Sequence, residues 1–238
     1  MLLAMPQLAP KAQAADAVFP TGVKAVGAGY LHSLLIAEDN TVWAWGDNSA
    51  GALGDGTTTS HYRPVQVTKN DGTPLSNAKA VYGGGYFSVA LLHDGTVWAW
   101  GKGRSGTLGN GSLEDQSQAV QVLQSDGSPL TQVQSIAAGY SHVLAVKTDG
   151  TVWGWGSNGS NTLSDSWDSM YSRAIQIKAS SSTYLTGVKE VAVGDYHSML
   201  LKQDGTVWAW GHNGLSQLGN GQTNNGSTYP VQVVDSSD

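Results

Sequence analysis

Short alternations of apolar and polar residues run along most of the chain, with four of them in each repeating stretch. In the second stretch we expect strands at 77–83, 88–92, 96–100 and 119–122, because β-branched and aromatic residues fill them and turn residues separate them. Apolar periodicity nowhere persists over the roughly ten residues that a helix needs. The pattern therefore predicts an all-β protein.

A Trp-x-Trp-Gly motif marks the third expected strand of every stretch and recurs at a constant interval of 55 residues. Its tryptophans are Trp43 and Trp45, Trp98 and Trp100, Trp153 and Trp155, and Trp208 and Trp210. Such a period indicates one supersecondary unit that buries its apolar face against its neighbours. Four short strands per unit predict a propeller blade. The expected repeats are about 22–76, 77–131, 132–186 and 187–238.

The two tryptophans of each motif lie two residues apart on a strand, so both point to the same face. We expect the pairs to fill the layers between adjacent blades, and a platform for stacking carbohydrate is the alternative. An Asp-Gly dipeptide such as Asp94-Gly95 precedes three of the motifs. It predicts a type I′ hairpin turn, which needs positive φ at both central positions.

Composition restricts the possible classes of function. The 238 residues carry a net charge of −6, only 13% of them are charged, and cysteine is absent. The negative balance disfavours nucleic acid as a partner, because clustered Lys and Arg supply most of that affinity. Without cysteine there is no disulfide, no thiolate nucleophile and no cysteine zinc site. No run is apolar for long enough to span a membrane, and nothing indicates a cofactor.

The first residues indicate the compartment. Residues 1–14 resemble a truncated signal peptide, because Leu2-Leu3-Ala4-Met5 is apolar and Ala12-Gln13-Ala14 has the small-x-small form of a cleavage site. Residues 15–21 then form an N-terminal extension to a repeat domain at 22–238. We expect a secreted or cell-envelope protein, and an unstructured tail is the alternative.

Three histidines, His32, His142 and His197, stand at equivalent positions beside a glycine corner, and we assign Ser88 to that position in the second copy. One interpretation makes them metal ligands. We favour imidazoles that hydrogen-bond to backbone, because the histidines lie on different blades and no carboxylate motif completes a shared site. We therefore expect neither a metal site nor catalytic residues.

Candidate binding residues lie where the copies differ, since a scaffold position repeats and a contact residue need not. In the third copy, Ser164 and Ser166 replace loop glycines and Trp167 follows. An aromatic, acidic patch on this loop is the composition of an interface hot spot, and drift with a partly buried tryptophan is the alternative. The patch comprises Trp167, Asp168, Met170 and Tyr171. Further candidates are Lys102 and Arg104, His61 and Tyr62, and His212.

The repeat resembles that of the regulator of chromosome condensation family. The resemblance rests on the runs 29–35, 39–42, 45–48 and 51–56, and it covers about residues 22–233 as four copies. It implies blades of a seven-bladed β-propeller, so four copies form an open arc or a fragment, which self-association could complete. It also implies protein binding.

We therefore expect an exported, non-enzymatic module that binds a protein partner through its variable loops. Guanine-nucleotide exchange on a small GTPase is one alternative, which the acidic balance and the apparent signal peptide disfavour. A second alternative is a lyase or hydrolase with a metal-assisted site at the central channel, where His32, His142 and His197 would converge.

Overall fold

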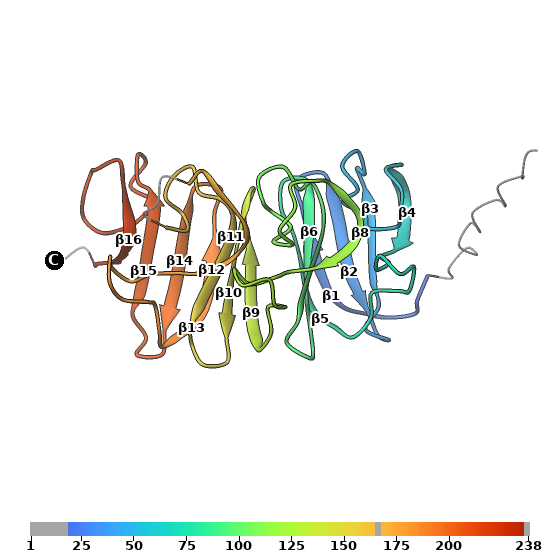
Figure 1. The fold of residues 1–238 in the computed structure, drawn as a ribbon, viewed down its shortest axis with the longest axis horizontal. Helices are drawn as coiled ribbons and strands as arrows, with labels where there is room; N and C mark the ends of the chain where they lie inside the picture. The colour runs from blue at the N-terminus through green and yellow to red at the C-terminus, as the bar shows by residue number, and fades with distance from the viewer. Residues whose placement is uncertain (1–18, 165–167, 236–238) are drawn as a thin grey trace, which may run out of the picture.

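The computed structural model describes residues 19–164 and 168–235. These residues form sixteen strands in four antiparallel sheets, each with its strands in chain order, and no helix (Figure 1). We number the sheets as blades 1 to 4. The prediction of an all-β protein made of four propeller blades is confirmed.

The blades repeat the same four-strand plan. Blade 1 contains β1 (Val23–Ala28), β2 (His32–Ala37), β3 (Val42–Gly46) and β4 (His61–Gln66). Blade 2 contains β5 (Ala78–Gly83), β6 (Phe87–Leu92), β7 (Val97–Gly101) and β8 (Gln116–Gln121). Blade 3 contains β9 (Val133–Ala138), β10 (His142–Lys147), β11 (Val152–Ser157) and β12 (Met170–Gln176). Blade 4 contains β13 (Val188–Val193), β14 (His197–Lys202), β15 (Val207–His212) and β16 (Gly226–Gln232).

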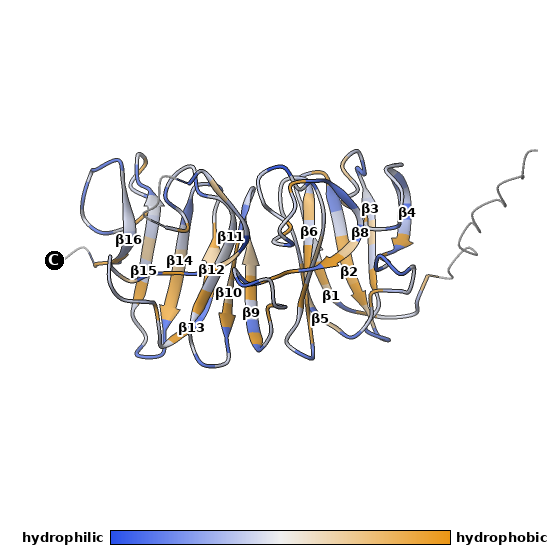
Figure 2. Cartoon of the chain, viewed as in Figure 1, coloured by the Kyte–Doolittle hydropathy of each residue, from blue (hydrophilic) through white to orange (hydrophobic). Residues whose placement is uncertain are grey.

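The blades stand in an open arc, with blade 1 at one end and blade 4 at the other (Figure 1). The first strand of each blade packs on that of the next, so β1, β5, β9 and β13 form the inner edge of the arc. Apolar residues lie along the strands and polar residues in the connecting loops (Figure 2). Three apolar clusters fill the spaces between successive blades.

The second tryptophan of each motif makes the contact between blades. Trp100, Trp155 and Trp210 are fully buried. Each indole Nε1–H donates to a carbonyl of the preceding blade, at 2.8 Å to Ala52, 3.0 Å to Thr107 and 2.8 Å to Thr162. These bonds satisfy the only polar atom of a large buried ring, so its whole surface can be desolvated.

The first tryptophan lies at the margin of the layer. Trp98, Trp153 and Trp208 are half-buried, and each Nε1–H donates to a threonine of its own blade. A lysine ammonium group stands 4.4–5.1 Å from each ring centroid, in a cation–π arrangement. The prediction that the tryptophan pairs fill the layers between blades therefore holds for the second tryptophan of each motif. The first tryptophan covers the outer margin of the layer.

The hairpin turns are not of type I′, so that prediction was wrong. In blade 2 the Leu92 carbonyl accepts the amide of Gly95, and of the turn residues only Gly95 has positive φ, at 79°. This is a type I turn followed by a left-handed residue. Asp94 accepts the amide and hydroxyl of Thr96 at 2.9 and 2.7 Å, which fixes the turn without a strained aspartate.

The fourth strand begins earlier than its apolar residues indicated. In blade 2 we expected 119–122, whereas β8 starts at Gln116, which pairs with Gly101 beyond a bulge. Gly101 has a φ of 102°, and a Cβ there would lie 2.6 Å from the Tyr86 carbonyl. An outer edge strand pairs through its backbone, so its polar first half carries no apolar signal.

Candidate protein-binding face

Four tyrosines gather on one face of the arc, at the loops where the first strand of each blade turns into the second. Because the strands alternate in direction, the loops between the third and fourth strands lie on the same face. Tyr30, Tyr86 and Tyr140 come from blades 1, 2 and 3, and their ring centroids lie 5.8–6.4 Å apart in edge-on contacts. Tyr196 holds the corresponding corner of blade 4. We call these four residues the tyrosine rim.

The tyrosine rim is accessible and has positive charge beside it. Tyr30 and Tyr196 are 63% and 60% exposed. The Lys102 ammonium group lies 5.0 Å from the Tyr86 ring centroid. Desolvation and the adjacent phenols of Tyr86 and Tyr30 raise the pKa of Tyr140, so its phenol stays a neutral hydrogen-bonding group at neutral pH. The rim therefore offers aromatic faces, phenolic hydroxyls and a cation on one surface.

Two small hollows open between the blades beside the rim. One of about 50 Å³ lies between Tyr86, Lys102 and Tyr140, and one of about 150 Å³ lies between His142, Asp195 and Tyr196. Pockets for drug-sized ligands measure about 300–1,000 Å³, so both hollows are notches in a surface and not deep pockets.

Two of the histidines at the glycine corners, His32 and His142, join one blade to the next. His32 Nε2 lies 2.8 Å from Ser88 Oγ, and that hydroxyl donates to the Ala52 carbonyl at 2.8 Å. In the same way, His142 Nε2 lies 3.0 Å from Ser198 Oγ, which donates to the Thr162 carbonyl at 3.1 Å. The expected imidazole bond to backbone is thus wrong, because a serine of the following blade stands between the ring and the carbonyl.

The second copy places Phe87, and not Ser88, at the histidine position. Phe87 pairs with Gly101 as His32 pairs with Gly46, so our assignment of Ser88 was displaced by one residue. The next blade has Val143 where the other junctions have serine, and both Phe87 and Val143 are buried. The middle junction thus replaces a polar pair with an apolar pair at the same place.

Burial keeps these imidazoles neutral. Desolvation lowers the pKa of His32 from 6.5 to about 4, although Asp47 partly opposes it, and lowers the pKa of His142 to about 3. Both rings are committed to serine contacts at separate junctions. In residues 19–164 and 168–235, no three His, Asp or Glu side chains are grouped to hold a metal ion. The structure does not bring the three histidines together at the channel.

Two of the candidate loops reach the tyrosine rim. Lys102 is exposed above Tyr86, with Arg104 exposed two residues beyond it. In blade 4 the His212 ring lies 6.5 Å from Tyr196, and its Nδ1 lies 2.8 Å from Gln217 Nε2. Lys102 and His212 therefore border the same surface, and Arg104 lies on the same loop as Lys102.

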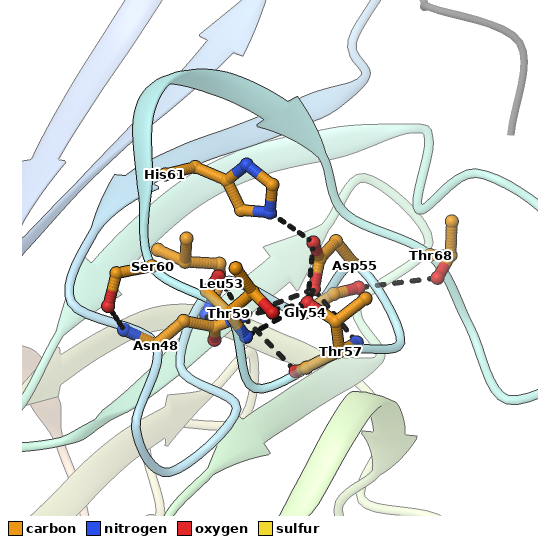
Figure 3. A network of polar contacts seen from close by, with 9 residues as sticks. All are labelled: Asn48, Leu53, Gly54, Asp55, Thr57, Thr59, Ser60, His61 and Thr68. Atoms are coloured by element: carbon orange, nitrogen blue, oxygen red, sulfur yellow. Dashed lines mark hydrogen bonds and ion pairs between the residues drawn. The ribbon is translucent and has the colours of Figure 1, made fainter. Parts of the chain in front are cut away.

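The first-copy candidates lie on the outer edge strand. His61 and Tyr62 begin β4, and Tyr62 is fully exposed. Figure 3 shows His61 pointing at Asp55. Their Nε2 and Oδ2 atoms are 3.1 Å apart without hydrogen-bond geometry, so the contact is electrostatic and depends on protonation of the ring. Buried Asn48 holds this loop together through bonds to the carbonyls of Thr57 and Thr59 and from the amide of Leu53.

The third-copy candidates are divided by the structure. Met170 and Tyr171 begin β12 and do not lie in a loop, because they pair with Ser157 and Gly156 of β11. The Tyr171 hydroxyl lies 2.6 Å from Ser164 Oγ. Asp168 is exposed, and its carbonyl accepts a bond from the buried Asn158. Trp167 lies outside the described residues.

Sequence reasoning missed the tyrosine rim, although a signal was present. Tyr30 and Tyr140 share one repeat position, and Tyr86 and Tyr196 share the position one residue later. A comparison of single columns at a 55-residue spacing therefore finds tyrosine only in alternate copies. Each glycine corner nonetheless contains one tyrosine, and this regularity could have revealed the rim.

Tandem four-stranded blades joined by buried tryptophans define a repeat-built β-propeller protein. Residues 4–238 match the RCC1-like domain. The chain belongs to this family, so the resemblance to the regulator of chromosome condensation repeat is confirmed.

Sequence relatives come from animals and plants. The chain is 34% identical over 200 residues to a probable E3 ubiquitin-protein ligase of Homo sapiens, HERC6, which covers 83% of this chain and 19% of that protein. It is 29% identical over 213 residues to the ultraviolet-B receptor UVR8 of Arabidopsis thaliana, covering 89% of this chain and 46% of that protein. The chain thus spans less than half the length of these two relatives.

Solved structures share the fold. Human WBSCR16 matches with a TM-score of 0.73 and 26% identity, over 88% of this chain and 51% of that one. Yeast RCC1 (Prp20), in its complex with Kap60, matches with a TM-score of 0.72 and 19% identity, over 90% and 49% of the two chains. Both likenesses extend over nearly the whole arc and about half of each larger propeller.

In the described residues no helix is long and apolar enough to cross a membrane.

Proposed function

We propose that this chain is a non-enzymatic module that binds a protein partner through the tyrosine rim and its bordering loops. The observation that carries the proposal is the packing of Tyr30, Tyr86 and Tyr140, from three blades, into one accessible aromatic surface beside Lys102. Rigid aromatic side chains and a nearby cation are the composition of interface hot spots, since they bury large areas with little loss of rotamer entropy.

The shape of this face supports a macromolecular partner. The hollows of about 50 and 150 Å³ are smaller than the pockets that enclose drug-sized ligands. A protein surface needs no enclosing pocket, because it contacts many shallow features at once. The net charge of −6 supports a protein rather than a nucleic acid.

The relatives support protein binding as well. Yeast RCC1 (Prp20) binds Kap60 in one crystal structure, and another crystallographic study addresses its binding to Gsp1p and histones. Guanine-nucleotide exchange remains the alternative function, and release of a labelled guanine nucleotide from a small GTPase would distinguish it from binding alone.

We propose a secreted or cell-envelope location. The apolar Leu2-Leu3-Ala4-Met5 and the small-x-small Ala12-Gln13-Ala14 support it. N-terminal sequencing of the protein from its native cells tests the proposal. A mature chain that begins at or near Ala15 supports export, and an intact N-terminus in the cytosolic fraction contradicts it.

The binding proposal is tested by comparing proteins captured by the purified chain and by two variants. Tyr30→Ser with Tyr140→Ser removes the centre of the rim, whereas Tyr62→Ser removes a fully exposed tyrosine on β4. Each rim tyrosine lost should weaken binding by about 2 kcal/mol, the usual size of a hot-spot truncation. The captured partner should be lost from the rim variant and kept by the control. Equal capture by all three proteins contradicts the proposal.

A further inference from the structure

The three junctions inside the arc show what one blade needs from the next. The earlier blade supplies its histidine-side apolar face and a loop carbonyl, and the later blade supplies a tryptophan Nε1–H and, at two junctions, a serine. Each junction is therefore directional, because its two sides carry different groups.

Blade 4 carries the first half of such a junction. His197 occupies the position of His32 and His142, and Gln217 occupies that of the acceptors Ala52, Thr107 and Thr162. His197 is half-buried and makes no side-chain hydrogen bond within the described residues.

The apolar side chains of this face are half-buried, whereas their counterparts inside the arc are fully buried. Met199, Leu201 and Val207 are half-buried in blade 4. In blade 2 the equivalent residues Val89, Leu91 and Val97 are at most 1% exposed. The difference is the covering that a following blade provides.

Blade 1 carries the second half. Ser33 and Trp45 occupy the positions of Ser88 and Trp100, are half-buried, and make no side-chain hydrogen bond within the described residues. Below them, Trp43 is already buried, and the ring of Phe19 packs on it edge-on with centroids 6.0 Å apart.

We propose that blade 4 of one copy docks against blade 1 of a second copy, in a head-to-tail junction that repeats the internal ones. Trp45 Nε1–H donates to the Gln217 carbonyl, and Ser33 pairs with His197, as Ser88 pairs with His32. On blade 1 these contacts form at Ser33 and Trp45. Among the described residues, Phe19 is the one that a second copy displaces. The junction is heterologous, so two copies close into a ring when both junctions form, and several copies make an open chain when they do not.

The test uses the purified full chain in sedimentation velocity over a wide concentration range. The parent should form dimers or larger species as its concentration rises. Leu201→Asp places a charge on the blade 4 face and should weaken association at least about tenfold, a loss of about 1.4 kcal/mol. The control Leu113→Asp makes the same change at an exposed side chain of blade 2, which carries neither open face, and it should associate like the parent. Far-UV circular dichroism verifies that each variant is folded.

Mixing two variants tests the direction of the junction. Trp45→Ala damages only the blade 1 face, so this variant and Leu201→Asp should each associate at least about tenfold more weakly than the parent when alone. A mixture should form 1:1 dimers, because the intact blade 4 of Trp45→Ala can dock on the intact blade 1 of Leu201→Asp.

Three results would overturn the proposal. The parent could remain monomeric at every concentration, which shows that a second copy does not cover the blade 4 face. Trp45→Ala alone could associate like the parent, which indicates pairing between two blade 4 faces. The two variants could also fail to associate on mixing while the parent associates.

Discussion

The buried His–Ser contacts make the stability of this protein sensitive to mild acid. His32 has a pKa of about 4 and His142 of about 3 in the folded chain, against 6.5 for an exposed imidazole. Between these values the unfolded chain binds more protons than the folded chain. Stability contributed by the neutral rings is therefore complete above about pH 6.5 and is lost as the pH falls toward the folded pKa values.

The magnitude follows from the difference in proton binding. Lowering the pH from about 7 to about 5 should cost on the order of 2 kcal/mol for each buried histidine, or about 4 kcal/mol for the two. His197 changes stability in the same direction, because desolvation lowers its pKa too. Five turn aspartates titrate below this window, since hydrogen bonds from threonine or serine lower the pKa of Asp39, Asp71, Asp126, Asp149 and Asp204.

The chain itself supplies the control variant. His32→Phe with Ser88→Val copies the apolar pair Phe87 and Val143 of the middle junction. The ring should fit, because Gly29 lies against the His32 ring as Gly84 lies against the Phe87 ring. The carbonyl of Ala52 keeps its bond from the Trp100 indole.

Urea unfolding followed by tryptophan fluorescence, at about pH 7 and about pH 5, measures the effect. The parent should lose about 4 kcal/mol between the two pH values and the double variant about 2 kcal/mol, because only His142 remains buried in it. Equal losses for parent and variant would refute the reasoning, since the acid sensitivity would then arise outside the His–Ser contacts.

Two further predictions concern stability at neutral pH, each measured by urea unfolding. Trp100→Ala should cost about 3–5 kcal/mol, because it empties a fully buried site and removes the indole hydrogen bond to the Ala52 carbonyl, and Trp98→Ala should cost clearly less, because that ring is half-buried. Equal losses would contradict the different roles of the two tryptophans. Gly101→Ala should cost more than about 2 kcal/mol, because strain at a φ of 102° adds to a clash with the Tyr86 carbonyl. Gly72→Ala should cost about 1 kcal/mol, since its φ of 81° is strained but nothing lies within 4 Å of the added Cβ. A Gly72 variant as unstable as the Gly101 variant would show that the close approach is unimportant.

The repeat made the fold predictable, and local geometry limited the detail. The 55-residue interval of Trp43, Trp98, Trp153 and Trp208 is enough to infer stacked four-stranded units, because side-chain alternation and burial act in the same direction in every copy. The turn type was not predictable from Asp-Gly alone. The dipeptide fits two turn geometries, and the bonds from Thr96 to Asp94 select one of them.

The candidate site was less predictable because it is assembled from staggered positions. The tyrosine rim combines Tyr30 and Tyr140 with Tyr86 and Tyr196, which stand one residue apart in the repeat. The His–Ser contacts join positions 56 residues apart, one more than the repeat, so they cross from one blade to the next. Neither relation lies within a single column of aligned repeats. The structure shows both directly, because the curvature of the arc places neighbouring corners against each other.

The pairing of His with Ser and of Phe with Val explains how junctions between nearly identical repeats differ in the partner that each accepts. A serine hydroxyl facing Phe87 would lose its ring partner, and a buried imidazole facing Val143 would lose its only side-chain hydrogen bond, which costs about 1–3 kcal/mol. The two sides of a junction must therefore match, although the strands around them are nearly interchangeable. His197 requires serine on the blade that follows it, and Ser33 offers that group on blade 1. The contact that joins the blades at two internal junctions thus also matches the two open faces to each other.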